Sequence, residues 1–280
     1  MRVRLTTLCE NTVGIFGFTG EWGLSILVQF GGETVLLDTG LSNSIVHNAT
    51  MANVNLKNIK KVVLSHGHAD HTGGLRVLLQ AIRSKVDVFA HPEIWGKKYS
   101  VRPKISGDRY QFIGIPFCRE ELEHLGASFN YSKAPFWLND DMVTTGEVPM
   151  ITPFEKIDKN LYVKTEKGYE PDTLPDDQAL VVKTPNGLVV VLGCAHRGMI
   201  NTLIHAQEIT GTKKILAVVG GAHLFRAGKE QLTQTILELK KLRVENLGVS
   251  HCTGMHASMA LASAFEANFF FNTAGTVVEL

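Results

Sequence analysis

Three histidines and an aspartate lie within six positions of the segment SHGHADHTGG (65–74), as His66, His68, Asp70 and His71. Imidazole nitrogens and carboxylate oxygens are the donors that Zn²⁺, and Fe or Mn in related roles, accept. Because one turn cannot wrap a single ion with four side chains at once, the spacing predicts two ions. His66 and His68 are expected to face one ion, and Asp70 and His71 the second. The alternative is a polar turn whose histidines cap a helix.

The elements that must hold this cluster are predicted from the spacing of apolar residues. An apolar strand, KVVLS (61–65), leads into the cluster, and Leu75, Leu78, Leu79 and Ile82 repeat after it at the spacing of an amphipathic helix. The cluster is therefore expected on a turn from a strand to a helix.

The remaining chain predicts an α/β (α+β) fold. Two strands, LSILVQF (24–30) and TVLLDTG (34–40), flank a glycine pair and form a hairpin. The second half alternates strands with helices: strands at 178–184, 188–194, 215–221, 246–252 and 276–280, and helices through 200–204, 232–239 and 255–267. Two mixed sheets sandwiched by helices fit this order better than one parallel sheet.

Residues 92–175 differ from the rest, with many of the nine prolines, several aromatics and little sustained periodicity. We interpret them as an inserted cap or loop region of a single domain over residues 1–280. The cap contains a basic run with four cations and two aromatic side chains: Lys97, Lys98, Arg102, Lys104, Trp95 and Tyr99. The cations could contact a phosphate and the aromatics a planar ring. A solvated surface loop is the alternative.

Three further histidines follow apolar runs, in GCAH (193–196), GGAHL (220–224) and SHCTG (250–254). All three segments are expected to open towards one rim of the fold. His196 and His223 are interpreted as metal ligands or as side chains that touch substrate, so we assign both, with Asp70, as catalytic candidates. Internally hydrogen-bonded histidines are the alternative.

Composition limits the partners of the protein. Lys plus Arg number 28 and Asp plus Glu 27, so no global field attracts nucleic acid or anionic membrane. No apolar stretch reaches the roughly 20 residues of a membrane span, and the start lacks a secretory signal. The four cysteines, Cys9, Cys118, Cys194 and Cys252, form no CxxC pair, which argues against a disulfide framework and a zinc ribbon. We expect a cytoplasmic protein with a small-molecule substrate. Composition does not decide between a monomer and a homo-oligomer.

SHGHADHTGG resembles the HxHxDHxGG signature of the metallo-beta-lactamase superfamily. The resemblance implies a four-layer αββα sandwich with two divalent metal ions, zinc or else Mn or Fe, at the ends of its sheets. Asp38, in LLDTG, matches the turn before the signature, and the resemblance implies that it orients a metal-bound histidine. A turn acid closing a hairpin is the alternative for Asp38. His251 matches the last histidine of the family pattern and is our candidate to complete the second ion.

Two positions depart from the family pattern. Cys194 stands where most members carry a metal-bridging aspartate, and a thiolate can bridge or ligate a soft ion. The usual GHTPG ligand segment is replaced by LPDDQAL (174–180). Asp176 and Asp177 could substitute for its histidine or form a polar turn.

ENTVG (10–14), EWGLSILV (21–28), GCAH, GGAHL and HCTG resemble one branch of the family over nearly the whole chain. This branch holds dihydropterin-methyl-ribofuranosylaminobenzene phosphate synthase-like proteins and metal-dependent hydrolases of beta-lactamase superfamily II. The resemblance implies an enzyme that hydrolyses a phosphoester or related bond in a small metabolite with a metal-activated water. The alternative is a pterin-type transferase that condenses a pterin pyrophosphate with an aromatic amine phosphate. A non-enzymatic binding module is the third hypothesis.

Candidate substrate contacts complete the predicted site. Thr253 and Gly254 open a helix whose free N–H groups can receive an anion. Glu21 lies near the pocket by resemblance. Together these positions favour a phosphorylated or pterin-like substrate.

Overall fold

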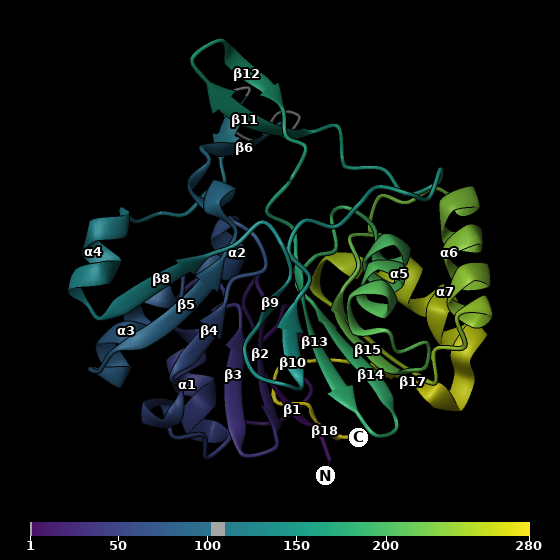
Figure 1. Ribbon diagram of the computed structural model, residues 1–280, viewed down its shortest axis with the longest axis horizontal. Coiled ribbons are helices and arrows are strands. Elements are labelled where there is room, and N and C mark those ends of the chain that lie inside the picture. Colours follow the sequence, from purple (N-terminus) through teal and green to yellow (C-terminus); the bar gives the residue numbers. More distant parts are fainter. Residues whose placement is uncertain (1, 102–109) are drawn as a thin grey trace.

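A computed structural model describes residues 2–101 and 110–280 of the chain. Two seven-stranded sheets pack face to face, and helices cover both outer faces (Figure 1). This architecture is the predicted αββα sandwich, which is therefore confirmed. None of the described helices is long and apolar enough to cross a bilayer.

The first sheet is mixed: its strands are antiparallel from β18 to β3 and parallel from β3 to β8. In spatial order the strands are β18 (Val277–Glu279), β1 (Arg4–Cys9), β2 (Ser25–Phe30), β3 (Glu33–Leu37), β4 (Lys61–Val63), β5 (Val86–Ala90) and β8 (Ala127–Tyr131). The carboxyl ends of the parallel strands β3 and β4 therefore meet at one edge.

The second sheet is also mixed, with parallel strands from β17 to β14 and antiparallel strands from β14 to β9. In spatial order the strands are β17 (Phe269–Phe271), β16 (Asn246–Ser250), β15 (Ile215–Gly221), β14 (Gly187–Leu192), β13 (Ala179–Thr184), β10 (Met142–Thr144) and β9 (Phe136–Trp137). The carboxyl ends of β14, β15 and β16 lie side by side for the same reason.

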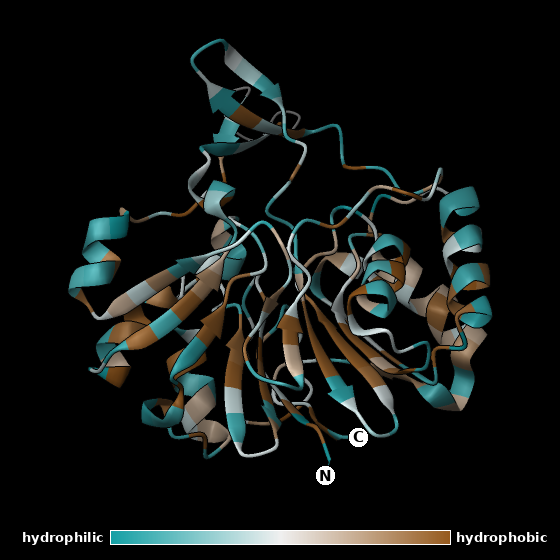
Figure 2. Cartoon of the chain, in the orientation of Figure 1, coloured by the Kyte–Doolittle hydropathy of each residue, from teal (hydrophilic) through white to brown (hydrophobic). Residues whose placement is uncertain are grey.

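Helices α1 (Ser44–Met51), α3 (Leu75–Ile82) and α4 (Arg119–His124) pack on the first sheet, and α5 (Met199–Thr210), α6 (Lys229–Lys241) and α7 (Met255–Phe265) pack on the second. The predicted leucine stripe of α3 is buried against the sheet, as expected. A third apolar layer lies between the sheets, and hydrophobic residues concentrate on the strands (Figure 2). Burial of each Val or Leu side chain in these layers contributes about 1.5–3 kcal/mol.

The range 92–175, predicted as one cap, divides between two parts of the molecule. Four strands form a separate antiparallel sheet: β6 (Lys98–Val101), β7 (Tyr110–Phe112), β11 (Leu161–Thr165) and β12 (Gly168–Pro171). This small sheet rises above the sandwich, opposite the chain termini (Figure 1). In contrast, β8, β9 and β10 extend the two main sheets and α4 packs on the first.

Candidate metal centre

Four strand ends carry a non-glycine residue with left-handed backbone. Asp38 follows β3 with φ 58°, Ala195 follows β14 with φ 49°, His223 follows β15 with φ 44°, and His251 follows β16 with φ 53°. Such conformations cost about 1–3 kcal/mol each and cluster at functional sites. The sharp turns redirect the chain where the candidate ligands begin.

Asp38 and Ser65 organise the segment that leaves β4. Ser65 donates from its backbone N to Asp38 Oδ1 at 2.7 Å and from Oγ to Asp38 Oδ2 at 2.6 Å. Since that hydroxyl proton is used, Ser65 Oγ accepts from His66 Nδ1 at 2.9 Å. His71 also donates from Nδ1 to Asp38 Oδ2, at 2.6 Å. Both histidines therefore present Nε2 to the centre, and Asp38 lies where the family resemblance implied that it orients a histidine.

The first donor set consists of His66, His68 and His196. His66 Nε2 lies 2.9 Å from His68 Nδ1 and 3.2 Å from His196 Nε2. All three rings are buried, and burial lowers the pKa of each, so the rings are neutral and offer lone pairs. His68 Nε2 and His196 Nδ1 are buried without a hydrogen-bond partner.

The second donor set consists of Asp70, His71 and His251. His251 Nε2 lies 3.2 Å from His71 Nε2 and 3.3 Å from Asp70 Oδ2. His251 donates from Nδ1 to Asn11 Oδ1 at 2.9 Å, so its Nε2 also faces the set. Trp22 Nε1 donates to Asp70 Oδ2 at 3.0 Å, which fixes the carboxylate.

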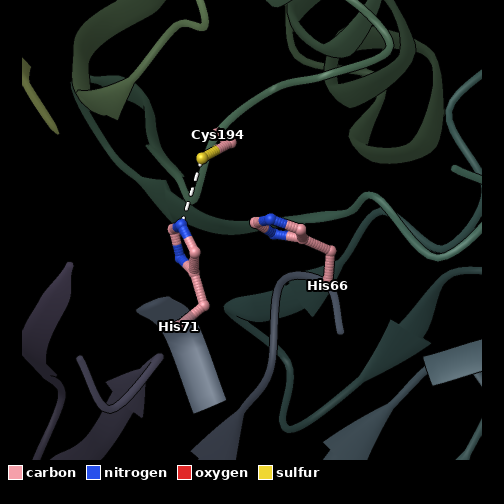
Figure 3. A group of neighbouring side chains, drawn as sticks. All are labelled: His66, His71 and Cys194. Atoms are coloured by element: carbon pink, nitrogen blue, oxygen red, sulfur yellow. Dashed lines mark hydrogen bonds between the residues drawn. The ribbon is translucent and has the colours of Figure 1, made fainter. Parts of the chain in front are cut away.

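Cys194 lies between the two sets. Its sulfur is 3.0 Å from His71 Nε2, and one donor atom each of Cys194, His66 and His71 lie within 4.8 Å of one another (Figure 3). Burial, together with the neighbouring Cys252, raises the pKa of Cys194 well above its usual range. A cation that binds Cys194 must therefore displace its proton.

The donor sets fit divalent cations. Zinc bonds of about 2.0–2.2 Å in tetrahedral geometry place two ligand nitrogens roughly 3.3 Å apart. The three long contacts within the sets are 3.2, 3.2 and 3.3 Å. In the first set the pKa of each imidazole is lowered, so its neutral rings turn lone pairs toward one another, an arrangement that a cation would stabilise. Residues His66, His68 and His196 would hold one ion, and Asp70, His71 and His251 another, with Cys194 beside both.

A cavity of about 790 Å³ opens over both sets. The small sheet contributes part of its wall, through Val101, Phe112 and Leu161, and Arg226 contributes a cation. His223 lines the cavity beside the sets: its ring centre lies 4.1 Å from that of His196. The cavity gives a small molecule access to the donor atoms.

Among the described residues, Asp176 and Asp177 join neither donor set, which favours the polar turn over the ligand role considered for them. Asp176 accepts from Gly67 N and from Lys98 Nζ, both at 2.8 Å. Asp177 accepts from Arg197 N at 2.8 Å. The missing third imidazole comes instead from His196, which the turn at Ala195 brings across to His66.

The structure places the three predicted substrate contacts away from the described cavity. Thr253 is fully buried and its Oγ1 accepts from Ala222 N at 3.1 Å. Glu21 accepts from Leu41 N at 2.9 Å and so fastens a loop. None of Thr253, Gly254 and Glu21 lines the described cavity.

Two residues of the basic run at 95–104, Lys98 and Trp95, have partners within the protein that the sequence analysis did not predict. Lys98 is not a surface cation, because its side chain is 2% exposed and paired with Asp172 and Asp176. Trp95 donates to Tyr131 Oη at 2.8 Å, away from the donor sets. Arg102 and Lys104 lie outside the described residues.

Comparison with known proteins now decides the family. Residues 22–251 match the profile of the family described as the metallo-beta-lactamase superfamily. The chain belongs to the metallo-beta-lactamase superfamily. This match confirms the resemblance drawn from the HxHxDHxGG signature. The family typically binds divalent metals, and the donor sets described above could hold them.

Three known proteins are similar over almost their full length. The 7,8-dihydropterin-6-methyl-4-(beta-D-ribofuranosyl)-aminobenzene-5'-phosphate synthase of Methanocaldococcus jannaschii is 31% identical over 288 residues, covering 99% of this chain and 96% of that protein. The crystal structure of Tm1679, described as a metal-dependent hydrolase of the beta-lactamase superfamily, matches with TM-score 0.85 and 29% identity over 99% of both chains. YhfI from Bacillus subtilis, at 14% identity and TM-score 0.60 over 100% of this chain and 99% of its own, shares the fold.

Several site residues escaped the sequence analysis. Ser65 adjoins the histidine cluster and its hydroxyl could have been recognised as a partner for His66. Asn11 and Trp22 lie in segments that were matched to the family branch but given no role. Asp158 and Arg226 carry no local signal, because only the tertiary fold brings them to the cavity.

Proposed function

We propose that the protein is a metal-dependent hydrolase of a phosphoester or related bond in a small anionic metabolite. The observation that carries the proposal is the pair of donor sets joined at Cys194 beneath a cavity with Arg226 and His223 on its wall. Two bound divalent cations would lower the pKa of a water molecule towards neutrality and stabilise charge on the attacking and leaving oxygens.

The cavity wall supplies donors for the anionic part of such a substrate. Arg226 Nη1 and His223 Nε2 lie 3.7 and 3.9 Å from Asp158 Oδ2, so one carboxylate holds both groups in place. Neither ring nitrogen of His223 has a hydrogen-bond partner within the protein, and the residue lines the cavity. In this proposal His223 donates a proton or hydrogen bond to the leaving oxygen, whereas Asp70 and His196 act as ligands.

Burial opposes a charge on His223, but Asp158 and Cys252 outweigh it and raise the pKa of His223 to about 9. His223 in turn holds the pKa of Asp158 well below its usual range. The pair is therefore ionic at neutral pH in the metal-free protein, and this charge distribution supports an anionic substrate.

The pterin-type transferase is the second candidate, favoured by the 31% identical synthase. Arg226, His223 and the bound cations would then stabilise a leaving pyrophosphate. An aromatic amine phosphate would attack in place of water. In both reactions the apolar cavity wall at Phe112 and Phe225 would contact a planar ring.

Product analysis separates the candidates. The protein, loaded with Zn²⁺ or Mn²⁺, is incubated with phosphomonoesters, phosphodiesters and pyrophosphates, and released phosphate is measured. A hydrolase releases product with water alone, and His68→Ala abolishes the release. Turnover that requires both a pterin pyrophosphate and an aromatic amine phosphate would replace the first candidate with the second. A bound ligand of unchanged mass after long incubation would reject both and support a binding module.

A further inference from the structure

Cys252 belongs to neither of the donor sets described above, yet it lies beside them. We propose that Cys252, Cys194 and His223 form a further cation site, selective for a soft divalent ion. One donor atom of each residue lies within 4.8 Å of the other two. Both cysteines are buried at 2% exposure and neither forms a disulfide.

The surrounding backbone makes room for the sulfur of Cys252. A Cβ atom added at Gly221 would lie 2.8 Å from Cys252 Sγ, so glycine at the end of β15 permits the close approach. The backbone N of His223 donates to Cys252 Sγ at 3.2 Å. An N–H bond to sulfur stabilises the thiolate that a cation requires. The position of Cys252 is therefore fixed from two sides.

His223 supplies the nitrogen of this site. Both ring nitrogens are buried without a hydrogen-bond partner, and Nε2 lies 3.9 Å from Asp158 Oδ2, so a ligand or cation could satisfy them. The left-handed backbone of His223, with φ 44°, turns the chain at the end of β15, next to the ends of β14 and β16 that lead to the cysteines. The three donors thus come from three adjacent parallel strands.

The donor chemistry distinguishes this site from the other two. Two thiolates and one imidazole form a soft set that prefers ions such as Zn²⁺ and Cd²⁺, whereas the other sets contain only imidazole and carboxylate groups apart from the shared Cys194. Binding removes any proton held by the two sulfurs and the proton on the coordinating nitrogen of His223, which is charged in the metal-free protein, and these protons pass to solvent as the three atoms coordinate the cation. Cys194, common to both regions, would bridge them. The inference concerns cation binding and can be tested without the reaction proposed above, although His223 can donate to a leaving oxygen only when no cation occupies this site.

Cadmium titration tests the proposal. Cd²⁺ is added to the full chain under reducing conditions, and the ultraviolet charge-transfer absorption between thiolate and cadmium is recorded. We expect the wild-type protein to reach the amplitude of two thiolates and Cys252→Ser to lose about half of it. Cys9→Ser is the matched control, because Cys9 is also buried but lies against Ser44 Oγ at 3.1 Å and is in no donor set. Its amplitude should equal that of the wild type.

Two outcomes overturn the proposal: a Cys252→Ser amplitude equal to that of the wild type, or a wild-type amplitude of one thiolate. ¹¹³Cd NMR of the wild-type protein repeats the test without any variant, so a folding defect in Cys252→Ser cannot obscure it. A resonance in the range of a site with two sulfurs supports the proposal, and resonances of nitrogen and oxygen sites alone reject it. His223→Ala should shift the two-sulfur resonance and leave the imidazole sites unchanged.

Discussion

Replacing Lys98 with methionine should destabilise the protein by several kcal/mol, although Lys98 belongs to neither donor set. The Lys98 ammonium lies 3.0 Å from Asp172 Oδ2 and 2.8 Å from Asp176 Oδ1, and all three side chains are buried. Lys98→Met keeps the aliphatic stem but leaves two buried carboxylates without their cation. Removing one partner of a buried ion pair costs about 3–5 kcal/mol.

Thermal and urea unfolding of the metal-free protein measure this loss. For 280 residues, an unfolding entropy of about 2.1 cal/mol/K per residue gives about 0.6 kcal/mol/K, so Tm should fall by about 5–9 °C. Lys97→Met is the control, because Lys97 is exposed next to Lys98 and should change stability by less than about 0.5 kcal/mol. If Lys98→Met is no less stable than Lys97→Met, the buried ion pair is not a stabilising feature and our reasoning fails.

The pH dependence of the stability difference between the wild type and Lys98→Met gives a second test of the buried ion pair. Burial alone would lower the pKa of Lys98, but Asp176 and Asp172 outweigh it and raise that pKa. A raised lysine pKa stabilises the fold fully below the unfolded value of about 10.4, and the contribution is lost as the pH rises through the folded pKa. The stability gap between wild type and Lys98→Met should therefore stay constant from about pH 7 to about pH 9 and narrow above about pH 10.

The same substitution should also lower the metal affinity of the first donor set. Asp176 Oδ2 accepts from Gly67 N, which lies between His66 and His68. When Asp176 loses Lys98, its hold on this segment weakens, and comparable losses of a ligand-orienting partner reduce metal affinity about 10–100-fold. Adding Asp172→Asn and Asp176→Asn to Lys98→Met removes the uncompensated charges and should restore most of the stability, which a role of Lys98 in packing alone would not produce.

Three further predictions concern the donor sets. His68→Ala and Asp70→Ala should each lose one metal equivalent by elemental analysis while the circular dichroism spectrum stays native; full occupancy in either variant would show that the ligand assignment is wrong. Burial opposes charge on His71, but Asp38 and Asp70 raise its pKa to about 9. Cation binding must displace this proton, so zinc affinity, measured by chelator competition, should rise below pH 9 by about tenfold per pH unit for each proton released; an affinity independent of pH would contradict the stated charge of His71. Cys194→Asp should retain metal with altered activity, and a variant unchanged in both would return Cys194 to a role in the core.

Local sequence determined the parts of this protein whose residues are neighbours along the chain. The four donors from His66 to His71 follow β4 at fixed spacing, and that spacing alone indicated metal chemistry. The positions of helix α3 and of the apolar strands were likewise predicted from the spacing of their apolar residues, because hydrophobic periodicity is a local property. Helix α1 is as long as α3 but was missed because its apolar residues carry little periodic signal, and strand β17 was missed because it has only three residues.

Only the tertiary structure decided how distant residues combine. His196 completes a three-imidazole set, and Asp176 pairs with Lys98 instead of serving as a ligand. Both outcomes depend on sharp turns at strand ends and on which ends lie side by side in the sheets. Sequence spacing cannot fix these, because a left-handed residue such as Ala195 has no distinctive local signature and its neighbours come from strands far apart in the chain. The sequence therefore specified the chemical character of the centre, whereas long-range packing selected which side chains share each set of donors.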